Sequence, residues 1–223
     1  MRRSGARRFV AAMPCLSALL AEHRSLLVLD AASTRIQVGW LRAGEPAQWI
    51  ELDDEANVAV FRAVEHLAGL QIDRVGAFAF CEGPGSILGI RTVAMALRTW
   101  TLLAPRPVYR YCSLALVAHA SDRPDLSVIA DARRDTWHVF ARADGLRRLP
   151  PGELRGALVT PAGFRSWSPL PPATGTTPYA VGQLLEATAA AELFSRTEAA
   201  DAFLHEEPSY ATWTPQIHRA PAP

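Results

Sequence analysis

Lysine is absent from the 223-residue sequence, and all 23 of its basic side chains other than histidine are arginines. A phosphate-binding P-loop needs Gly, four residues and then Gly-Lys-Ser/Thr, so that class of nucleotide-binding protein is excluded. Cysteine and histidine are also scarce. The three cysteines form no C-x-x-C pair and the six histidines form no H-x-x-x-H or H-E-x-x-H pair, so we expect no metal site built by the protein.

An excess of charge of either sign is missing too. The formal net charge of +1 gives no general attraction to nucleic acid, so any contact with nucleic acid has to be local. Cys15, Cys81 and Cys112 are odd in number and stand in apolar surroundings, which favours reduced thiols in a cytoplasmic protein over disulfides. The composition is that of an ordinary soluble globular protein, and we expect no membrane contact.

Residues 1–24 combine several arginines with an apolar stretch at 9–21, which superficially resembles a secretory signal. Glu22-His23-Arg24 lacks the small-residue cleavage pattern, however, and a predicted strand begins almost at once. We therefore expect a loose N-terminal extension rather than a cleaved signal.

The remaining sequence predicts an α/β protein of two unequal lobes. The N-terminal lobe, residues 25–122, begins with a meander of three short strands. A helix at 57–70 follows, with apolar residues on one broad face. A short apolar strand at 75–80, a glycine loop and a second long helix at 87–104 complete the main part of this lobe.

The C-terminal lobe, residues 123–204, is smaller and has diverged. Prolines become frequent after Leu149, so we expect long loops there, with a last strand at 179–181 and a last helix at 183–194. A proline-rich tail occupies residues 205–223.

The two lobes open with similar sequences. The first lobe begins with Leu26-Leu27-Val28-Leu29-Asp30-Ala31, and the second begins with the similar stretch Leu126-Ser127-Val128-Ile129-Ala130-Asp131-Ala132. Each stretch reads as a strand that ends in Asp-Ala and leads into a turn and a second strand. The equivalent placement at the start of each half indicates a duplicated unit.

The loop Gly83-Pro84-Gly85-Ser86 joins a buried strand to a helix. Its glycines permit unusual backbone angles and Ser86 is a good N-cap, so the loop could present free amides to a phosphate or carboxylate. The same pattern also fits a tight connection that only packs closely against its neighbours. A hydrolase centred on Ser86, with His119 or His138 and Asp131 as partners, lacks the Gly-x-Ser-x-Gly spacing of a nucleophile elbow.

The helix at 87–104 has more apolar surface than one sheet face can bury. Its remaining arc places Met95 and Leu102 between two arginines on one side and two threonines on the other. An apolar ridge bordered in this way indicates a contact surface for another protein. A second layer of the protein's own core is the alternative.

These motifs together resemble the TsaB (YeaZ) family. The resemblance depends on the Asp30 turn, on Gly83-Pro84-Gly85-Ser86 followed by Gly89 and Arg91, and on Asp131-Ala132-Arg133 at the duplicated turn. It runs from about Leu26 to Ala143, just over half the chain. The chain is a divergent member, because the family loop usually continues Ser-Phe-Thr-Gly where Ser86-Ile87-Leu88-Gly89 stands here.

The resemblance implies a two-lobed fold of the actin-like ATPase and sugar kinase type, built from duplicated ribonuclease-H-like halves. It also implies a function. TsaB-like proteins are non-catalytic subunits that pair with the catalytic subunit TsaD, and with the ATPase TsaE, to make N6-threonylcarbamoyladenosine in certain tRNAs. No catalytic residue and no cofactor of its own are then expected, and tRNA is bound only through the complex.

In that family the two helices of the first lobe dock on equivalent helices of TsaD. The contact residues that this implies here are Arg62, Glu65, Arg91, Thr92, Met95, Arg98, Thr99 and Leu102. A second set of candidate residues, for contact with an anion or nucleotide, comprises Gly83, Pro84, Gly85, Ser86, Asp30, Asp131 and Arg133. Binding of ATP or ADP at the joint with TsaD, and a homodimer when TsaD is missing, stay open.

An active small-molecule kinase of the same fold is an alternative function, with Asp30 and Asp131 holding magnesium. Phosphate turns of that kind need glycines for close backbone approach. Ala31-Ala32-Ser33 and Ala132-Arg133-Arg134 contain none, which disfavours the kinase.

Overall fold

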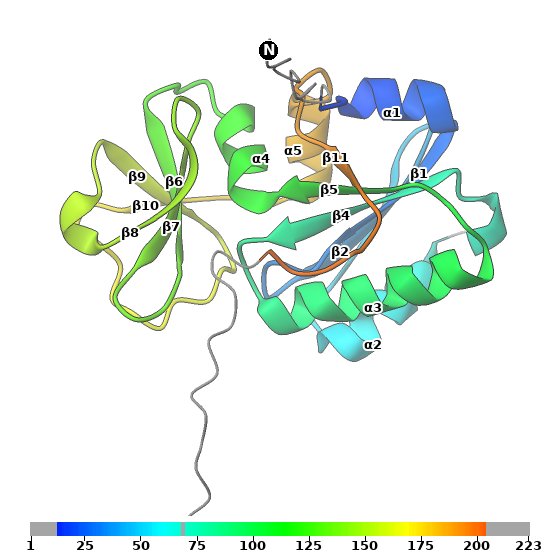
Figure 1. Cartoon of the computed structure of the whole chain (residues 1–223), viewed down its shortest axis with the longest axis horizontal. Helices are drawn as coiled ribbons and strands as arrows, with labels where there is room; N and C mark the ends of the chain where they lie inside the picture. Colours follow the sequence, from blue (N-terminus) through cyan, green and yellow to red (C-terminus); the bar gives the residue numbers. More distant parts are fainter. Residues whose placement is uncertain (1–12, 68–69, 204–223) are drawn as a thin grey trace, which may run out of the picture.

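A computed structural model describes residues 13–67 and 70–203 of the chain. Within these ranges the chain forms two mixed β-sheets, each at the centre of one lobe (Figure 1). The strand order is β11-β5-β4-β1-β2-β3 in the first sheet and β10-β9-β6-β7-β8 in the second. The predicted tail at 205–223 lies outside the described residues.

The first sheet contains the predicted meander. Its strands β1, β2 and β3 are antiparallel neighbours, and β4 and β5 extend the sheet in parallel from β1. Leu27 and Leu29 of β1 stand opposite Phe78 and Phe80 of β4, and all four side chains are fully buried. The strands are β1 (Ser25–Asp30), β2 (Ile36–Arg42), β3 (Gln48–Leu52), β4 (Ala77–Gly83), β5 (Val108–Cys112) and β11 (Ser195–Thr197).

Helices cover both faces of this sheet, which explains why its central strands read as continuous apolar runs. On one face, α2 (Ala56–His66) and α3 (Ile87–Leu103) pack on Leu27, Leu29 and the phenylalanines of β4. On the other face lie α1 (Leu16–His23), α4 (Ser113–Ala120) and α5 (Val181–Ala187) (Figure 1).

The second sheet repeats the plan of the first. Strands β6, β7 and β8 form an antiparallel meander, and β9 joins β6 in parallel, with Val128 opposite Val159. Where the first half has α2, the second has only the 3-10 turn η2 (Pro151–Glu153), so the second lobe is smaller. The strands are β6 (Leu126–Asp131), β7 (Trp137–Ala141), β8 (Gly145–Leu149), β9 (Ala157–Pro161) and β10 (Gly175–Thr177).

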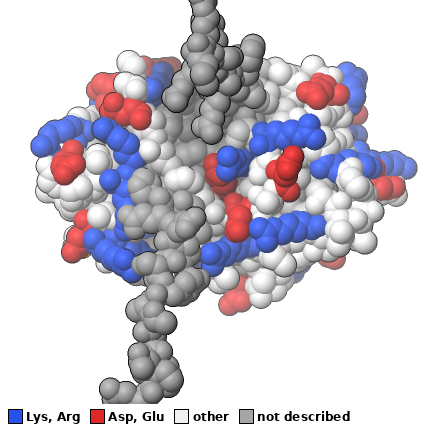
Figure 2. Space-filling view, in the orientation of Figure 1, with Lys and Arg blue, Asp and Glu red and all other residues white. Residues whose placement is uncertain are grey.

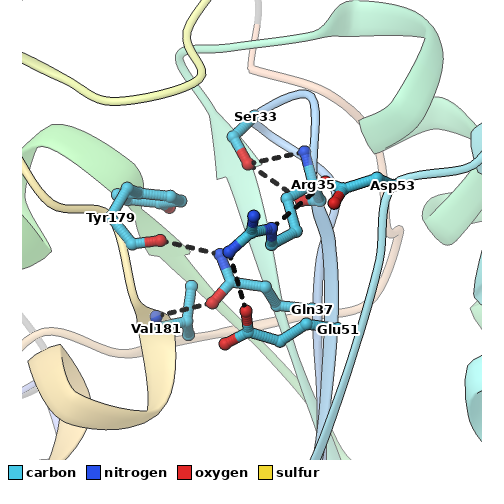
Figure 3. Close-up of polar contacts among 7 residues, drawn as sticks. All are labelled: Ser33, Arg35, Gln37, Glu51, Asp53, Tyr179 and Val181. Carbon is cyan, nitrogen blue, oxygen red and sulfur yellow. Dashed lines mark hydrogen bonds and ion pairs between the residues drawn. The ribbon is translucent and has the colours of Figure 1, made fainter.

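The last helix of each lobe contacts the other lobe, so the two lobes share one core. Helix α4 follows β5 of the first sheet and packs on β6 and β7 of the second. Helix α5 follows β10 of the second sheet and attaches to the first through the amide of Gln37. Gln37 donates from Nε2 to the Tyr179 carbonyl at 2.9 Å and accepts from the Val181 amide at 2.8 Å (Figure 3).

Two expectations for the first lobe need correction. The segment expected as a loose extension, residues 1–24, contains α1, whose Leu16 and Leu19 are buried in the core; residues 1–12 lie outside the described part. The helix expected at 57–70 ends at His66, because Leu67 turns to an extended conformation and packs into the core. Residues 68–69 are outside the described ranges.

The end of the chain also differs from expectation. The strand expected at 179–181 does not form there; the nearest strand is β10, at Gly175–Thr177, which pairs in parallel with β9. The last helix begins at Val181, where the Gln37 side chain accepts its first amide, and ends at Ala187 instead of 194. Strand β11, which the sequence reading missed, then pairs with β5.

None of the helices within residues 13–67 and 70–203 combines the length and apolar character that a bilayer-spanning helix requires.

Candidate functional site

The pocket between the two lobes gathers most of the loop residues predicted from the sequence. Its volume is about 190 Å³, and its lining includes Gly83 to Ser86 from the first lobe and Asp131 and Arg133 from the second. Asp30 is not part of the lining, because it lies fully buried beneath the pocket's first-lobe wall.

The glycine loop is packed against the turn that follows β1. A Cβ on Gly85 would stand 2.4 Å from the carbonyl oxygen of Ala32, and a Cβ on Gly89 would stand 2.4 Å from that of Ala31. The Ser86 amide donates to the Ala32 carbonyl at 2.8 Å. These contacts support the tight-connection interpretation, since part of the loop's donor capacity is already used within the first lobe.

Ser86 caps α3. Its hydroxyl accepts from the Gly89 amide at 3.3 Å, as an N-cap side chain does. The loop therefore uses this hydroxyl for helix geometry, which gives the Ser86-centred hydrolase no structural support beyond the positions of Asp131 and His138 in the same pocket.

Asp30 is sealed by the chain's own donors. The hydroxyls of Tyr111 and Tyr179 each lie 2.7 Å from its Oδ2, and the Ala32 amide donates to Oδ1 at 3.0 Å. Burial raises the pKa of Asp30, and these hydrogen bonds offset only part of that effect. A carboxylate in this setting is not open to a magnesium ion, which weakens the kinase alternative further.

Asp131 is more accessible but also engaged. Its Oδ1 accepts from the Arg133 amide at 2.6 Å, and its Oδ2 accepts from the amides of Trp167 and Ser168 at 2.8 and 2.7 Å. Burial raises the pKa of this carboxyl, but the amides of Ser168, Arg133 and Trp167 outweigh burial and hold the pKa below its ordinary value. The carboxylate thus fixes the loop that contains Trp167 to the end of β6.

The second-lobe wall of the pocket contains residues that sequence reasoning missed. Arg133 lies over the ring of Trp167, with its guanidinium carbon 4.3 Å from the ring centroid, and Arg165 lines the same pocket. Trp167 and Arg165 come from the proline-rich stretch between β9 and β10, where no periodicity marks their position. Glu82 also lines the pocket and pairs with Arg110 at 2.9 Å.

A second, more apolar hollow lies between α2 and α3. This α2–α3 groove has a volume of about 410 Å³. Phe61 of α2 and Trp100 of α3 both line it and meet edge to face, with ring centroids 6.3 Å apart. The groove is lined by Asn57, Phe61, Leu88, Arg91, Thr92, Met95, Ala96, Thr99 and Trp100.

An apolar ridge runs along α3 beside the groove. The α3 ridge consists of Leu88, Met95 and Leu102, which lie seven residues apart and are 77%, 58% and 85% exposed. Met95 and Leu102 are therefore not a second layer of this chain's own core. Residues seven apart on a helix share one side of it, so the ridge follows most of the length of α3.

The predicted contact residues are distributed around this groove. The groove is lined by Arg91, Thr92, Met95 and Thr99. Arg62 of α2 instead pairs with Asp54, which precedes this helix, at 2.9 Å. Arg98 faces another side of α3, where it donates to the Ala200 carbonyl at 2.8 Å and pairs with Asp201 at 3.2 Å. Sequence reasoning missed Phe61, Leu88 and Trp100 as groove residues, because it assigned them to the core or left them unassigned.

The described residues contain no group of three or more His, Cys, Asp or Glu side chains that could hold a metal ion.

Comparison with known proteins gives one family match over part of the chain. A family model described as TsaD, tRNA N6-adenosine threonylcarbamoyltransferase, matches residues 55–149. No curated protein sequence matches significantly.

Two solved structures share the fold. YeaZ from Pseudomonas aeruginosa has a TM-score of 0.55 and 21% identity, and the match covers 74% of this chain and 90% of that chain. A protein of P. aeruginosa described as uncharacterized, with similarity to peptidase YeaZ, has a TM-score of 0.52 and 21% identity over 73% and 89% of the two chains. The two-lobed fold expected from the sequence is confirmed by these likenesses.

Proposed function

We propose that this chain, a TsaB (YeaZ)-like protein, is a non-catalytic subunit of a complex that makes N6-threonylcarbamoyladenosine in tRNA. In that complex it binds the threonylcarbamoyltransferase TsaD and stabilises it. The family-model match at residues 55–149 supports the proposal, because that segment contains both α2 and α3.

The observation that carries the proposal is the unburied apolar surface of the α2–α3 groove and the α3 ridge. Leu102 is 85% exposed and Met95 58%, and Met95 lines the groove together with Phe61 and Trp100. Covering one such side chain with a partner is favourable by about 1.5–3 kcal/mol, so several together supply a useful part of a binding free energy. Contiguous apolar surface of this kind marks protein contact sites.

The spacing of the α3 ridge suits a helical partner segment. Apolar residues repeated every seven positions form a straight seam, and a second helix laid along that seam can insert its own side chains between them. Arg91, Thr92 and Thr99 border the seam and would fix the register of the partner helix. This is the helix-in-groove mode of recognition, with TsaD as the helix donor.

The proposal extends to three finer points. TsaE joins the complex as a further partner, and tRNA is bound by the assembled complex. ATP or ADP, where it takes part, binds at the joint with TsaD rather than in a site that this chain completes alone. In the absence of TsaD, the exposed groove and ridge favour a homodimer through the same surface. The complex is proposed to act in the cytoplasm.

Co-expression with TsaD from the same genome tests the proposal. The wild-type chain is expected to co-purify with TsaD as a heterodimer on a sizing column. Met95→Glu is expected to abolish co-purification, because the carboxylate would be desolvated in the interface without a partner. Leu170→Glu is a matched control, since Leu170 is also exposed, at 43%, but lies in the second lobe.

The fold of each variant is checked by circular dichroism and thermal unfolding. Both substitutions replace exposed side chains, so their midpoints should lie close to that of the wild type. Failure of the wild-type chain to bind TsaD would refute the proposed function. Equal binding by Met95→Glu and Leu170→Glu would refute the choice of surface.

A further inference from the structure

A pocket at the far end of the first sheet is not used by the proposed function. It lies where β1 begins and β2 ends, at the end of the sheet that points away from the second lobe (Figure 1). Its volume is about 330 Å³. Arginines from three separate segments line it: Arg24 before β1, Arg42 at the end of β2 and Arg74 before β4.

Two buried donors in the lining residues lack an acceptor. The indole Nε1 of Trp40 and the Nε of Arg42 are both shielded from solvent and have no hydrogen-bond partner among residues 13–67 and 70–203. Trp40 is 94% buried, since only 6% of it is exposed, and the Arg42 guanidinium lies over its ring at 4.3 Å. Leaving a buried donor unpaired is unfavourable, so two such donors beside one pocket indicate an acceptor that the described part of the chain does not supply.

The charges around the pocket are unbalanced. Arg42 pairs with Glu45, at 2.6 Å, and among the residues that the structure describes Glu45 is the only acidic one in the lining. Within the described part of the chain, Arg24 and Arg74 have no ion-pair partner, and both are exposed. The lining therefore carries three positive charges against one negative charge.

The local backbone holds these arginines in place. The Ala43 amide donates to the Arg24 carbonyl at 2.9 Å, and the Ser25 hydroxyl donates to the Arg74 carbonyl at 3.1 Å. Arg24 has a φ of 65°, in the left-handed region where glycine is the less strained choice. One main-chain bond and one bond from a side-chain hydroxyl to a main-chain carbonyl thus join the three arginine-bearing segments, so the pocket does not depend on one loop.

We infer that this pocket binds a phosphate group. A phosphate offers several anionic acceptor oxygens, which suits a site with three guanidinium groups and two unpaired N–H donors. A carboxylate has fewer acceptors and would leave more of the donors unpaired. The mixed charge of the face seen in Figure 2 gives no broad basic surface, so the attraction of this pocket for an anion is local.

The phosphate has two possible sources, a phosphodiester of RNA or a small phosphorylated compound. The RNA source rests on the proposed function, in which the complex works on tRNA, and adds to it a direct contact between this chain and the RNA backbone. The exposed Arg24 and Arg74 would contact a backbone phosphate without reading bases, so this contact would position the RNA and not select its sequence.

Titration of the isolated full-length chain tests this inference. The indole N–H signals of the six tryptophans are followed by NMR during addition of inorganic phosphate and, separately, of unmodified tRNA. The Trp40 signal, assigned with Trp40→Phe, is expected to shift with both ligands while the other indole signals stay in place. No shift of the Trp40 signal with either ligand would overturn the inference.

A charge-matched pair of variants separates site binding from general attraction. Arg24→Gln with Arg74→Gln is expected to weaken tRNA binding about tenfold at 50 mM salt and to reduce the slope of log K against log salt by about 1–2. Arg155→Gln with Arg196→Gln removes the same charge elsewhere on the surface and should change neither quantity. An equal loss in both double variants would overturn the inference.

The two sources give different results. A Trp40 shift with phosphate but no effect of the Arg24/Arg74 variant on tRNA binding would assign the pocket to a small phosphorylated ligand and refute the RNA source. The proposed function is tested without RNA, by co-purification with TsaD, so the two proposals can fail independently.

Discussion

The hydroxyl of Tyr179 donates a 2.7 Å hydrogen bond to the carboxylate of Asp30, although the two residues stand 149 positions apart. Tyr179 lies in the segment that leads from the second sheet into α5, and Asp30 ends β1 of the first sheet. The bond therefore ties α5 to the centre of the first lobe. A second tyrosine, Tyr111 at the end of β5, donates to the same oxygen at 2.7 Å.

Removal of one of these hydroxyls should lower stability measurably. Tyr179→Phe leaves the ring in place but removes a donor from a buried carboxylate, and we expect the free energy of unfolding to fall by about 1–2 kcal/mol. Urea denaturation at pH 7 measures this. A double-mutant cycle with Tyr111→Phe should show coupling of at least about 0.5 kcal/mol, because both hydroxyls serve one oxygen. Strict additivity would show that the two bonds act independently.

The free energy of unfolding should depend on pH in part because Asp30 titrates differently in the folded and unfolded protein. Burial raises its pKa above the ordinary 3.8, so the folded protein binds this proton more tightly than the unfolded chain does. The resulting stabilisation is fully present below pH 3.8 and is lost as the pH rises through the folded-state pKa. Asp30→Asn cannot titrate at this position, so the difference in unfolding free energy, wild type minus variant, should decrease from pH 3.5 towards neutrality.

Denaturation curves for both proteins at several pH values provide the measurement. An increase in that difference with rising pH would contradict a raised pKa for Asp30, because it would mean that the ionised form is the one stabilised by folding.

Gly89, near the start of α3, offers a test of the close packing between this helix and the turn that follows β1. In most helices Gly→Ala stabilises the fold by about 0.5–1 kcal/mol. At Gly89 the new Cβ would stand 2.4 Å from the backbone oxygen of Ala31, so we expect Gly89→Ala to destabilise by about 1–3 kcal/mol instead. Gly152→Ala is the control, because its Cβ would meet nothing within 4 Å. Stabilisation by Gly89→Ala would show that the start of α3 does not pack closely against the turn that follows β1.

The first lobe could be predicted well from sequence, because each of its elements has a local signal. The alternation within 35–41 and the apolar run before Asp30 predict strands, and the helix expected at 87–104 has no internal proline to interrupt it. The duplicated Asp-Ala turns further indicated that the second half repeats the first. These signals depend on residues close in sequence, which is why they can be read without the fold.

The errors occur where distant contacts decide the structure. Helix α5 begins at Val181 because Gln37, far away in β2, accepts the amide of that residue. Helix α1 is part of the fold because Leu19 fills a core made by the sheet, although its sequence resembles a signal segment. Likewise, the basic pocket of Arg24, Arg42 and Arg74 joins residues from three segments, and no spacing rule brings them together.

The thiols give a further prediction. Burial raises the pKa of Cys112 to about 11, and it raises that of Cys81 well above its ordinary range. Both groups therefore remain protonated at pH 8, and protonated thiols are poor nucleophiles. We expect iodoacetamide to modify Cys15 at least tenfold faster than either of them in the native protein, as measured by peptide mass spectrometry. Equal rates would indicate that the core around β4 and β5 opens readily.

Two variants of Ser86 can distinguish a structural role of its hydroxyl from a catalytic one. If its hydroxyl serves only to cap α3, Ser86→Ala should cost about 1 kcal/mol of stability, whereas Ser86→Asn, which also caps helices well, should cost a few tenths at most. Both variants should bind TsaD as the wild type does, and a fluorophosphonate probe should leave the wild-type hydroxyl unmodified. A hydrolase would give the reverse pattern, because Asn preserves the cap and abolishes the nucleophile. Covalent labelling at Ser86 that both variants lose would therefore assign it a chemical function despite its hydrogen bond to the Gly89 amide.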